Sequence, residues 1–493
     1  MKKLFILLAA ATALTLASCT PKAPDEVPTA DETEPEAEVT ENAENEEEDE
    51  AEDEEVEVDY LSDLSTDRFD GYNFRILVRK GQVNDQAPLE DSDDLVVGAT
   101  FRRNKIVEDM YGITIEALES SDSNYDTSAM NTILAGDDAY DIIFSHCRAA
   151  FTYAVQGAAL NINEIPEIHL DKPWWAKDIS DSCDINGNLY VLSGDISSKP
   201  LGAAMCLYFN KRIFDELGFD YPYDMVRDGE WTFDNFSYMV RKAGRDLNGD
   251  GVMKSEDDQF GLIAGQWEEP INILYAAGQK IYDKNEDGEL ELTLYSNKTV
   301  AVYDAFFSLM NNEACIMSSA GRGYASGDAW GNGRQMFQGA ELQHAAIYRN
   351  MDDDFGILPY PKFDEEDDYH TASNGGTVMM IVPITVPDTH RTGAITEALC
   401  AIGSRDVIPA FYDVSLKTKY ARDTDSEEMI DLIKDSIIFD MGYLAGGTFQ
   451  SCGYDLAQME TPNFSSYYQA RESKAKDALK SFCEAYGGTG EDE

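Results

Sequence analysis

Short apolar runs alternate with longer amphipathic segments from residue 72 onward. An apolar run of about four to eight residues is typical of a buried strand, whereas apolar residues three or four positions apart are typical of a helix. The strand pattern occurs at 72–79, 113–118 and 140–145, and the helix pattern at 94–111, 124–135 and 149–157. This order predicts a parallel sheet covered by helices, with ligands bound outside the carboxyl ends of the strands.

The rest of the chain carries further strands and is otherwise mostly helical to about residue 482. Apolar runs predict strands at 203–210, 260–264, 355–359 and 377–382, and the polar residues 285–288 predict the turn of a hairpin. A capped helix is predicted to start within residues 231–234. The pattern therefore predicts the α/β fold class, and it contains no internal repeat.

The N-terminus has the pattern of a secretory signal peptide. Two lysines precede an apolar run from Leu4 to Leu16, which is too short for the roughly 20 residues of a membrane-spanning helix. The next residues, up to Cys19, resemble the bacterial lipobox, in which the peptide is cut before the cysteine and a diacylglycerol is attached to its sulfur. We therefore expect a signal peptide at 1–18 and acyl chains on Cys19 that anchor the protein in the membrane.

Charge divides the remaining chain into an acidic segment and a folding body. The 493 residues carry a formal charge of −56, which argues against nucleic acid as a partner because both would be strongly negative. Between Thr20 and Asp59 there are 20 acidic residues and one basic residue, with no aromatic residue to build a core. We expect 19–59 to be the lipidated cysteine and a disordered acidic tether. The body is long enough for two lobes, and its negative charge favours neutral ligands.

The seven cysteines after Cys19 show no metal or redox pattern. No CxxC motif and no Cys/His cluster occurs, so the sequence supports neither a zinc site nor a redox site. We expect small buried side chains in preference to a disulfide framework.

A series of segments through the body resembles one protein family. YDIIFS (140–145), NGNLYVL (186–192), LYFNKRIFDELG (207–218), EWTFDNF (230–236), MFQGAEL (336–342) and FGILPYPK (355–362) occur in that order. The series resembles the family 1 extracellular solute-binding proteins, the maltose-binding type, of carbohydrate ABC importers. The resemblance implies a two-lobe periplasmic-binding-protein-like fold with hinge crossovers and a central cleft.

Mapped onto this chain, the resemblance also implies domain boundaries. The crossovers would fall near 200–206, 339–344 and 374–378. Lobe one would comprise 60–201 and 341–373, lobe two would comprise 202–340 and 374–482, and 483–493 would form a C-terminal tail.

One loop has the ligand spacing of a structural calcium site. In such loops positions 1, 3 and 5 offer side-chain oxygens, position 7 offers a carbonyl and position 12 closes the shell. The corresponding residues are Asp246, Asn248, Asp250, Val252 and Asp257. Asp258 can replace Asp257, and the alternative is an acidic turn that holds no metal.

Candidate ligand-binding residues follow predicted strands or lie in crossovers. Sugars need aromatic faces for their C–H surfaces and forked donors and acceptors for their hydroxyls. These residues are Arg79, Ser145, His146, Arg148, Trp267, Trp330, Gln343, Asn374 and Gly375. We assign Trp174, Trp175 and Trp231 to packing instead.

The resemblance implies a receptor and no enzyme. No G-x-S-x-G, HExxH or P-loop motif occurs. We expect a monomeric, lipid-anchored protein on the extracellular face of the cytoplasmic membrane, which captures a sugar or oligosaccharide and delivers it to the permease of an ABC importer. The alternative is a surface glycan-adhesion or glycan-hydrolysing lipoprotein without a transporter.

Overall fold

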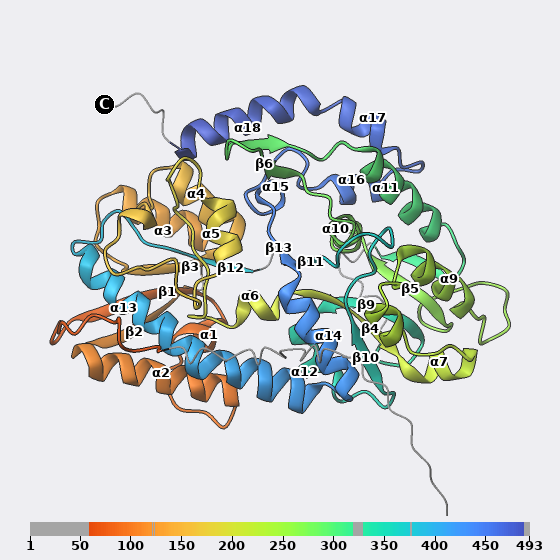
Figure 1. Cartoon of the computed structure of the whole chain (residues 1–493), viewed down its shortest axis with the longest axis horizontal. Coiled ribbons are helices and arrows are strands. Elements are labelled where there is room, and N and C mark those ends of the chain that lie inside the picture. The colour runs from red at the N-terminus through yellow and green to blue at the C-terminus, as the bar shows by residue number, and fades with distance from the viewer. Residues whose placement is uncertain (1–58, 121, 123, 319–328, 375–376, 488–493) are drawn as a thin grey trace, which may run out of the picture. The chain divides into compact units, whose positions relative to one another are not determined.

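The computed structural model describes residues 59–120, 122, 124–318, 329–374 and 377–487 (Figure 1). The predicted signal peptide, Cys19, the acidic segment as far as residue 58, and Gly375 lie outside these residues. Within the described ranges, no helix combines the length and the apolar character needed to cross a membrane.

The first sheet has four strands in the order β12-β3-β1-β2. They are β1 (Asn73–Arg79), β2 (Thr114–Ser120), β3 (Ile142–His146) and β12 (Val378–Ile381). Strand β1 is parallel to both β2 and β3, while β12 is antiparallel to β3. The predicted parallel βαβαβ arrangement is therefore confirmed.

Helices pack around this sheet and complete lobe one. They are α1 (Val83–Gln86), α2 (Leu95–Tyr111), α3 (Tyr125–Leu134), α4 (Cys147–Val155), η1 (Ile162–Glu164), α5 (Lys177–Cys183) and α13 (Thr389–Ile402). Helix α2 begins at Asp94, whose carboxylate accepts hydrogen bonds from the N–H groups of Val96 and Val97. It ends at Gly112, whose φ of 71° reverses the chain into β2.

The second sheet has five strands in the order β10-β4-β9-β5-β8. They are β4 (Met205–Asn210), β5 (Phe260–Gly265), β8 (Cys315–Ser318), β9 (Gln335–Glu341) and β10 (Phe355–Leu358). Every residue of β4, β5 and β10 is buried, as expected for strands covered on both faces.

Lobe two is built around this second sheet. Its helices are α7 (Lys211–Leu217), α8 (Tyr223–Arg227), α9 (Phe233–Ala243), α10 (Glu269–Ala276), α11 (Asn297–Met310), η3 (Leu342–His344), α12 (Ala345–Tyr348) and α14 (Thr424–Asp435). The Thr232 hydroxyl accepts a hydrogen bond from the Asn235 N–H, so the predicted cap of α9 is confirmed. Strands β6 (Tyr282–Lys284) and β7 (Leu290–Leu292) form the predicted hairpin.

The division of the chain between the lobes differs from the sequence-based expectation. Strand β10, from the segment 341–373 assigned to lobe one, pairs with β4 in lobe two. Strand β12, from the segment 374–482 assigned to lobe two, pairs with β3 in lobe one. The predicted crossover at 339–344 is also wrong, because the chain stays in lobe two from β9 to β10.

Between residues 59 and 435, the structure describes three crossovers between the lobes. The first contains α6 (Lys199–Gly202), and the second contains β11 (Thr371–Ala372), which pairs with β13 (Ile437–Ile438). The third contains the π-helical segments η4 (Gly403–Val407) and η5 (Ala410–Tyr420), which lie along α2 before the chain reaches α14 on β10. The crossovers predicted near 200–206 and 374–378 thus lie close to the first two.

The C-terminal helices contact both lobes. They are α15 (Met441–Leu444), α16 (Cys452–Ala457), α17 (Phe464–Gln469) and α18 (Glu472–Gly487). Phe464 of α17 packs on Tyr303 of α11, whereas Tyr486 of α18 packs on Phe151 of α4 and on Tyr190. The predicted tail at 483–493 is therefore wrong for 483–487, which complete α18 because Tyr486 is fully buried.

All seven described cysteines are thiols and none forms a disulfide. Six of them are buried, and Cys483 is partly exposed. The expectation of small buried side chains is confirmed for these six.

Candidate functional site

Four of the predicted ligand-binding residues meet at one end of the lobe-one sheet. The register pairs Leu77 with Ile143, so two residues further along Arg79 lies beside Ser145. His146 ends β3 and lies opposite Val378 of β12, and Arg148 follows in the first turn of α4. The carboxyl ends of β1 and β3 therefore bring Arg79, Ser145, His146 and Arg148 together, as expected for parallel strands.

Ser145 holds the end of β3 in place. Its side chain is buried, and its hydroxyl donates a hydrogen bond of 2.5 Å to a carboxylate oxygen of Asp126 in α3. Burial raises the pKa of Asp126, while the Ser145 hydroxyl and the nearby Arg79 oppose the shift. Ser145 thus positions its neighbours from inside the lobe, and its burial corrects the prediction that it contacts ligand.

His146 caps α4 and is neutral at physiological pH. Its Nδ1 accepts a hydrogen bond from the Arg148 N–H at 3.3 Å. Burial, together with the charges of Arg79 and Arg148, lowers the pKa of His146 to about 4. The positive charge at this point therefore comes from the two arginines.

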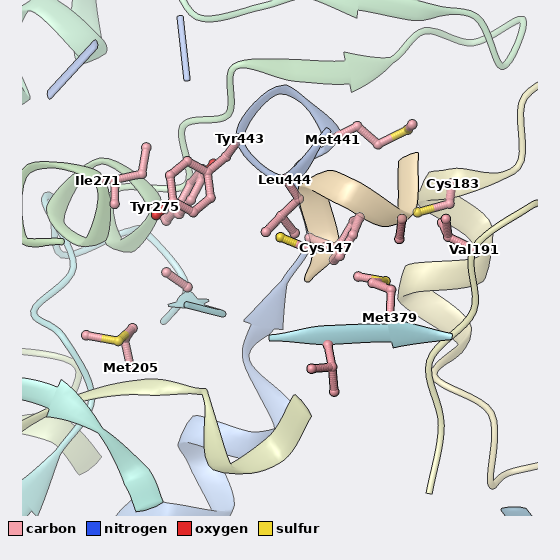
Figure 2. Packing of buried hydrophobic residues seen from close by; sticks show 14 of the residues in the cluster. Cys147, Cys183, Val191, Met205, Ile271, Tyr275, Met379, Met441, Tyr443 and Leu444 are labelled. Atoms are coloured by element: carbon pink, nitrogen blue, oxygen red, sulfur yellow. The ribbon is translucent and has the colours of Figure 1, made fainter. Parts of the chain in front are cut away.

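Arg148 faces an aromatic side chain that sequence reasoning missed. Its guanidinium carbon lies 5.8 Å from the centroid of the Tyr443 ring, within cation–π distance. Tyr443 also packs edge-on against Tyr275 of α10, with ring centroids 6.1 Å apart. Figure 2 shows Tyr443 and Tyr275 in one buried cluster with Cys147 of α4. This cluster joins α4 of lobe one, α15 and α10 of lobe two.

Asp440 fixes the position of Tyr443. Its buried carboxylate accepts hydrogen bonds from the N–H groups of Ile281, Tyr282 and Gly442 and from the Tyr275 hydroxyl. Burial raises its pKa, and these hydrogen bonds oppose the shift. Such a set of donors stabilises a buried carboxylate, so α15 is held firmly beside α10 and β6.

Trp267 lies just beyond β5 in lobe two, with its side chain 37% exposed. Its indole stacks on the ring of Tyr454 in α16, with centroids 4.0 Å apart and planes 13° apart. The preceding Gln266 accepts a hydrogen bond of 2.6 Å from Gln458, which ties the same two segments together. One face of the indole is therefore supported by Tyr454, another residue that the sequence did not indicate.

The other four tryptophans are packing residues. Trp330 was predicted to contact ligand, but it is only 3% exposed and packs against Tyr208, Tyr348 and Phe355. A side chain so covered offers no face to a ligand, so this prediction is corrected. The assignment of Trp174, Trp175 and Trp231 to packing is confirmed by their burial.

Gln343 and Asn374 lie near the crossovers. The Gln343 amide oxygen accepts a hydrogen bond of 3.2 Å from Lys199 of α6. The same ammonium lies 3.4 Å from Asp85 of lobe one. The Asn374 N–H donates to the carbonyl of Ala203, which joins the first two crossovers. Both side chains are thus placed at the hinge, and their contact with ligand stays a prediction.

A cavity of 420 Å³ lies on the hinge, away from the arginines. Its lining includes Trp175 and Asp195 of lobe one, Ser404 of the third crossover, and Lys434 of α14. Burial raises the pKa of Asp195 to about 6, while Ser404 and Lys434 oppose the shift. The cavity is thus lined by groups from lobe one, from the third crossover and from lobe two.

The predicted calcium loop is closed by hydrogen bonds to its own backbone. Asp246 accepts from the N–H groups of Gly249 and Gly251, and Asp250 accepts from that of Val252. Asp258, which is buried, accepts from Leu247 and Lys254, whereas Asp257 is exposed. Over the described residues, no three His, Cys, Asp or Glu side chains gather to hold a metal ion. The structure does not assemble the predicted ligand set, and calcium stays a prediction from spacing.

We expect that, in chelator, Asp258→Asn lowers the melting temperature and Asp257→Asn leaves it unchanged. The backbone hydrogen bond from Lys254 lowers the pKa of Asp258, so its charged form stabilises the loop. Melting curves in chelator and in excess Ca²⁺ would measure both effects. A calcium-dependent rise that Asp257→Asn abolished would show instead that the loop closes around the ion.

The fold matches solved structures of transport proteins at low sequence identity. The GacH receptor of Streptomyces glaucescens GLA.O, solved alone and with acarbose, is 11% identical with a TM-score of 0.55, over 83% of this chain and 99% of that one. A Thermotoga lettingae ABC transporter solute-binding protein bound with α-D-tagatose is 15% identical with a TM-score of 0.53, over 84% and 100%. UgpB from Mycobacterium tuberculosis, with glycerophosphocholine, is 13% identical with a TM-score of 0.54, over 83% and 98%.

No protein-family model matches the sequence, and no curated protein matches it either. The likeness therefore rests on architecture, over nearly the whole length of each solved chain. Its two helix-covered sheets, joined by hinge crossovers, give this chain the two-lobe fold of the periplasmic-binding-protein-like solute-binding proteins.

Proposed function

We propose that this chain is the substrate-binding protein of an ABC importer and captures a sugar or oligosaccharide. The observation that carries the proposal is Trp267, an exposed indole backed by Tyr454 at the carboxyl end of β5. A rigid aromatic face at a strand end suits the apolar C–H face of a sugar ring. Two solved proteins of this fold are described with acarbose and with tagatose, which supports the same ligand class.

The two lobes provide a means of capture. Arg79, His146 and Arg148 lie at strand ends of lobe one, and Trp267 lies at a strand end of lobe two. Bending at the crossovers would bring the two sets onto opposite sides of one ligand, as hinge closure does in two-lobe binding proteins. The closed form then differs in shape from the open form, which gives a permease a means of recognising the loaded receptor.

The lipobox-like sequence before Cys19 supports a lipid anchor on the extracellular face of the membrane. An acylated cysteine followed by a charged, extended segment would hold the receptor near its permease. Growth of cells in a radiolabelled fatty acid would test this anchor, because Cys19→Ala abolishes the label if the cysteine is acylated. Persistent labelling of that variant would contradict it.

Replacing Trp267 by alanine is expected to weaken binding of the best sugar at least about tenfold. The reason is that an aromatic face contributes about 0.5–1.5 kcal/mol beyond the apolar area it buries. Titration calorimetry against a panel of mono- and oligosaccharides measures the effect. Tyr238→Ala is the matched control, because Tyr238 is an exposed ring on α9. Equal affinity of the Trp267 variant and the parent would remove Trp267 from the site, and silence toward every sugar would overturn the proposal.

A further inference from the structure

Arg79 and Arg148 lie together at the carboxyl ends of β1 and β3 without a carboxylate partner among the described residues. Other arginines of this acidic chain are paired, such as Arg75 with Asp138 and Asp141, and Arg212 with Glu216 and Asp353. Across the residues that the structure describes, neither Arg79 nor Arg148 forms an ion pair, although the chain holds 94 acidic residues. Both side chains are partly buried.

No described carboxylate forms an ion pair with either arginine, although Asp126 lies near enough to Arg79 for their charges to interact. His146 contributes no charge of its own, and Asp126 is engaged by the Ser145 hydroxyl, without an ion pair to Arg79. The Tyr443 ring covers one side of Arg148 but offers no negative charge. The Nε of Arg148 is buried and has no hydrogen-bond acceptor. A buried cationic N–H without an acceptor is costly, so an acceptor supplied by a bound ligand would stabilise it.

The backbone adds to the positive potential at the same place. Helix α4 is nine residues long and begins at Cys147, between His146 and Arg148. The amino end of a helix carries a partial positive charge that favours anions. Two guanidinium groups and this helix end thus lie together at the carboxyl ends of β1 and β3.

We propose that the sugar bound at this site carries a negatively charged group, which Arg79 and Arg148 hold. This inference rests on the proposed function and narrows its ligand class from sugars in general to acidic ones. The group is a carboxylate, as in a uronic acid, or a phosphate ester, since guanidinium groups bind both through paired hydrogen bonds.

One charged group is compatible with the charge of the whole protein. The formal charge of −56 repels a polyanion at long range and slows its approach. A sugar with one negative charge meets little of that repulsion, and it gains two local contacts once it arrives. The expectation of a neutral ligand came from the net charge, which averages over this positive site.

The test compares each neutral oligosaccharide with its charged counterparts. Titration calorimetry would use glucose and galactose disaccharides, the same disaccharides with the terminal C6 oxidised to a carboxylate, and the same disaccharides with a 6-phosphate. We expect one charged form to bind at least about tenfold tighter than its neutral counterpart. The carboxylate and phosphate arms decide which group the site takes.

Substitution of the two arginines tests whether they cause the preference for charged sugars. Arg79→Gln and Arg148→Gln should each lower the affinity for the charged sugar about tenfold or more and leave that for the neutral sugar almost unchanged. Arg102→Gln is the control, because it removes one exposed charge from α2 of the same lobe. Neutral sugars that bind as tightly as charged ones would overturn this inference and leave the proposed function standing. Failure of every sugar, neutral or charged, would overturn both.

Discussion

Replacing Glu397 by alanine is expected to lower the free energy of unfolding by about 3–5 kcal/mol. The Glu397 carboxylate on α13 is buried and accepts hydrogen bonds from the indole N–H groups of Trp174, at 3.1 Å, and Trp175, at 2.9 Å. It also accepts from the backbone N–H of His169 at 3.3 Å. Burial raises its pKa, and these donors oppose the shift. Alanine would leave two buried indole donors without an acceptor and a cavity beside them.

Urea unfolding followed by tryptophan fluorescence would measure this loss. Glu397→Gln is the matched variant, since its amide oxygen can still accept one of the two indole hydrogen bonds. We expect Gln to cost less than half as much as Ala. Equal costs for the two variants would show that the volume of the side chain, and not its acceptor oxygens, stabilises lobe one.

Raising the pH from 5 to 9 is expected to lower the free energy of unfolding by about 4 kcal/mol through Glu269 alone. Burial raises the pKa of this carboxyl group to about 8 in the folded protein, above its ordinary value of 4.5. The folded state therefore keeps a proton that the unfolded state has lost. The stabilisation is complete below pH 4.5 and disappears as the pH rises through 8.

Glu269→Gln should remove most of this pH dependence. The neutral amide can still accept the hydrogen bond of 2.9 Å from the Tyr360 hydroxyl. Unfolding curves at pH 5, 7 and 9 for both proteins would measure the difference. Glu256→Gln is the control, because Glu256 is an exposed residue of the same lobe. A pH profile that Glu269→Gln left unchanged would place the titrating group elsewhere.

The sequence predicted most strands but not which lobe each would join. Hydrophobic periodicity marks a segment as a strand, because a buried run must be apolar wherever it pairs. Strands β10 and β12 are both four-residue buried runs, FGIL and VMMI. Nothing in such a run specifies β4 or β3 as its partner. Which lobe each of these two strands joins depends on where the chain crosses from one lobe to the other.

The candidate site was predictable where it depended on local order along the chain. Arg79, Ser145, His146 and Arg148 follow adjacent parallel strands, so topology alone brings them together. The prediction that Trp330 contacts ligand was wrong because this side chain is buried by Tyr208 of β4 and Tyr348 of α12. Neither residue is near Trp330 in the sequence.

Tyr443 and Tyr454 were missed for a related reason. Both belong to short C-terminal helices, α15 and α16, that carry no motif. Their importance comes from long-range contacts, with Arg148 and with Trp267 respectively. Such contacts become visible only when the distant segments are placed together in the fold.

The C-terminal helices give the two lobes a second joint. Helix α17 is fixed to α11 of lobe two through Phe464, and α18 is fixed to α4 of lobe one through Phe482 and Tyr486. This connection lies apart from the three crossovers. Any change in the angle between the lobes would therefore have to be accommodated at the aromatic contacts of Phe464 and Tyr486 as well as at the crossovers.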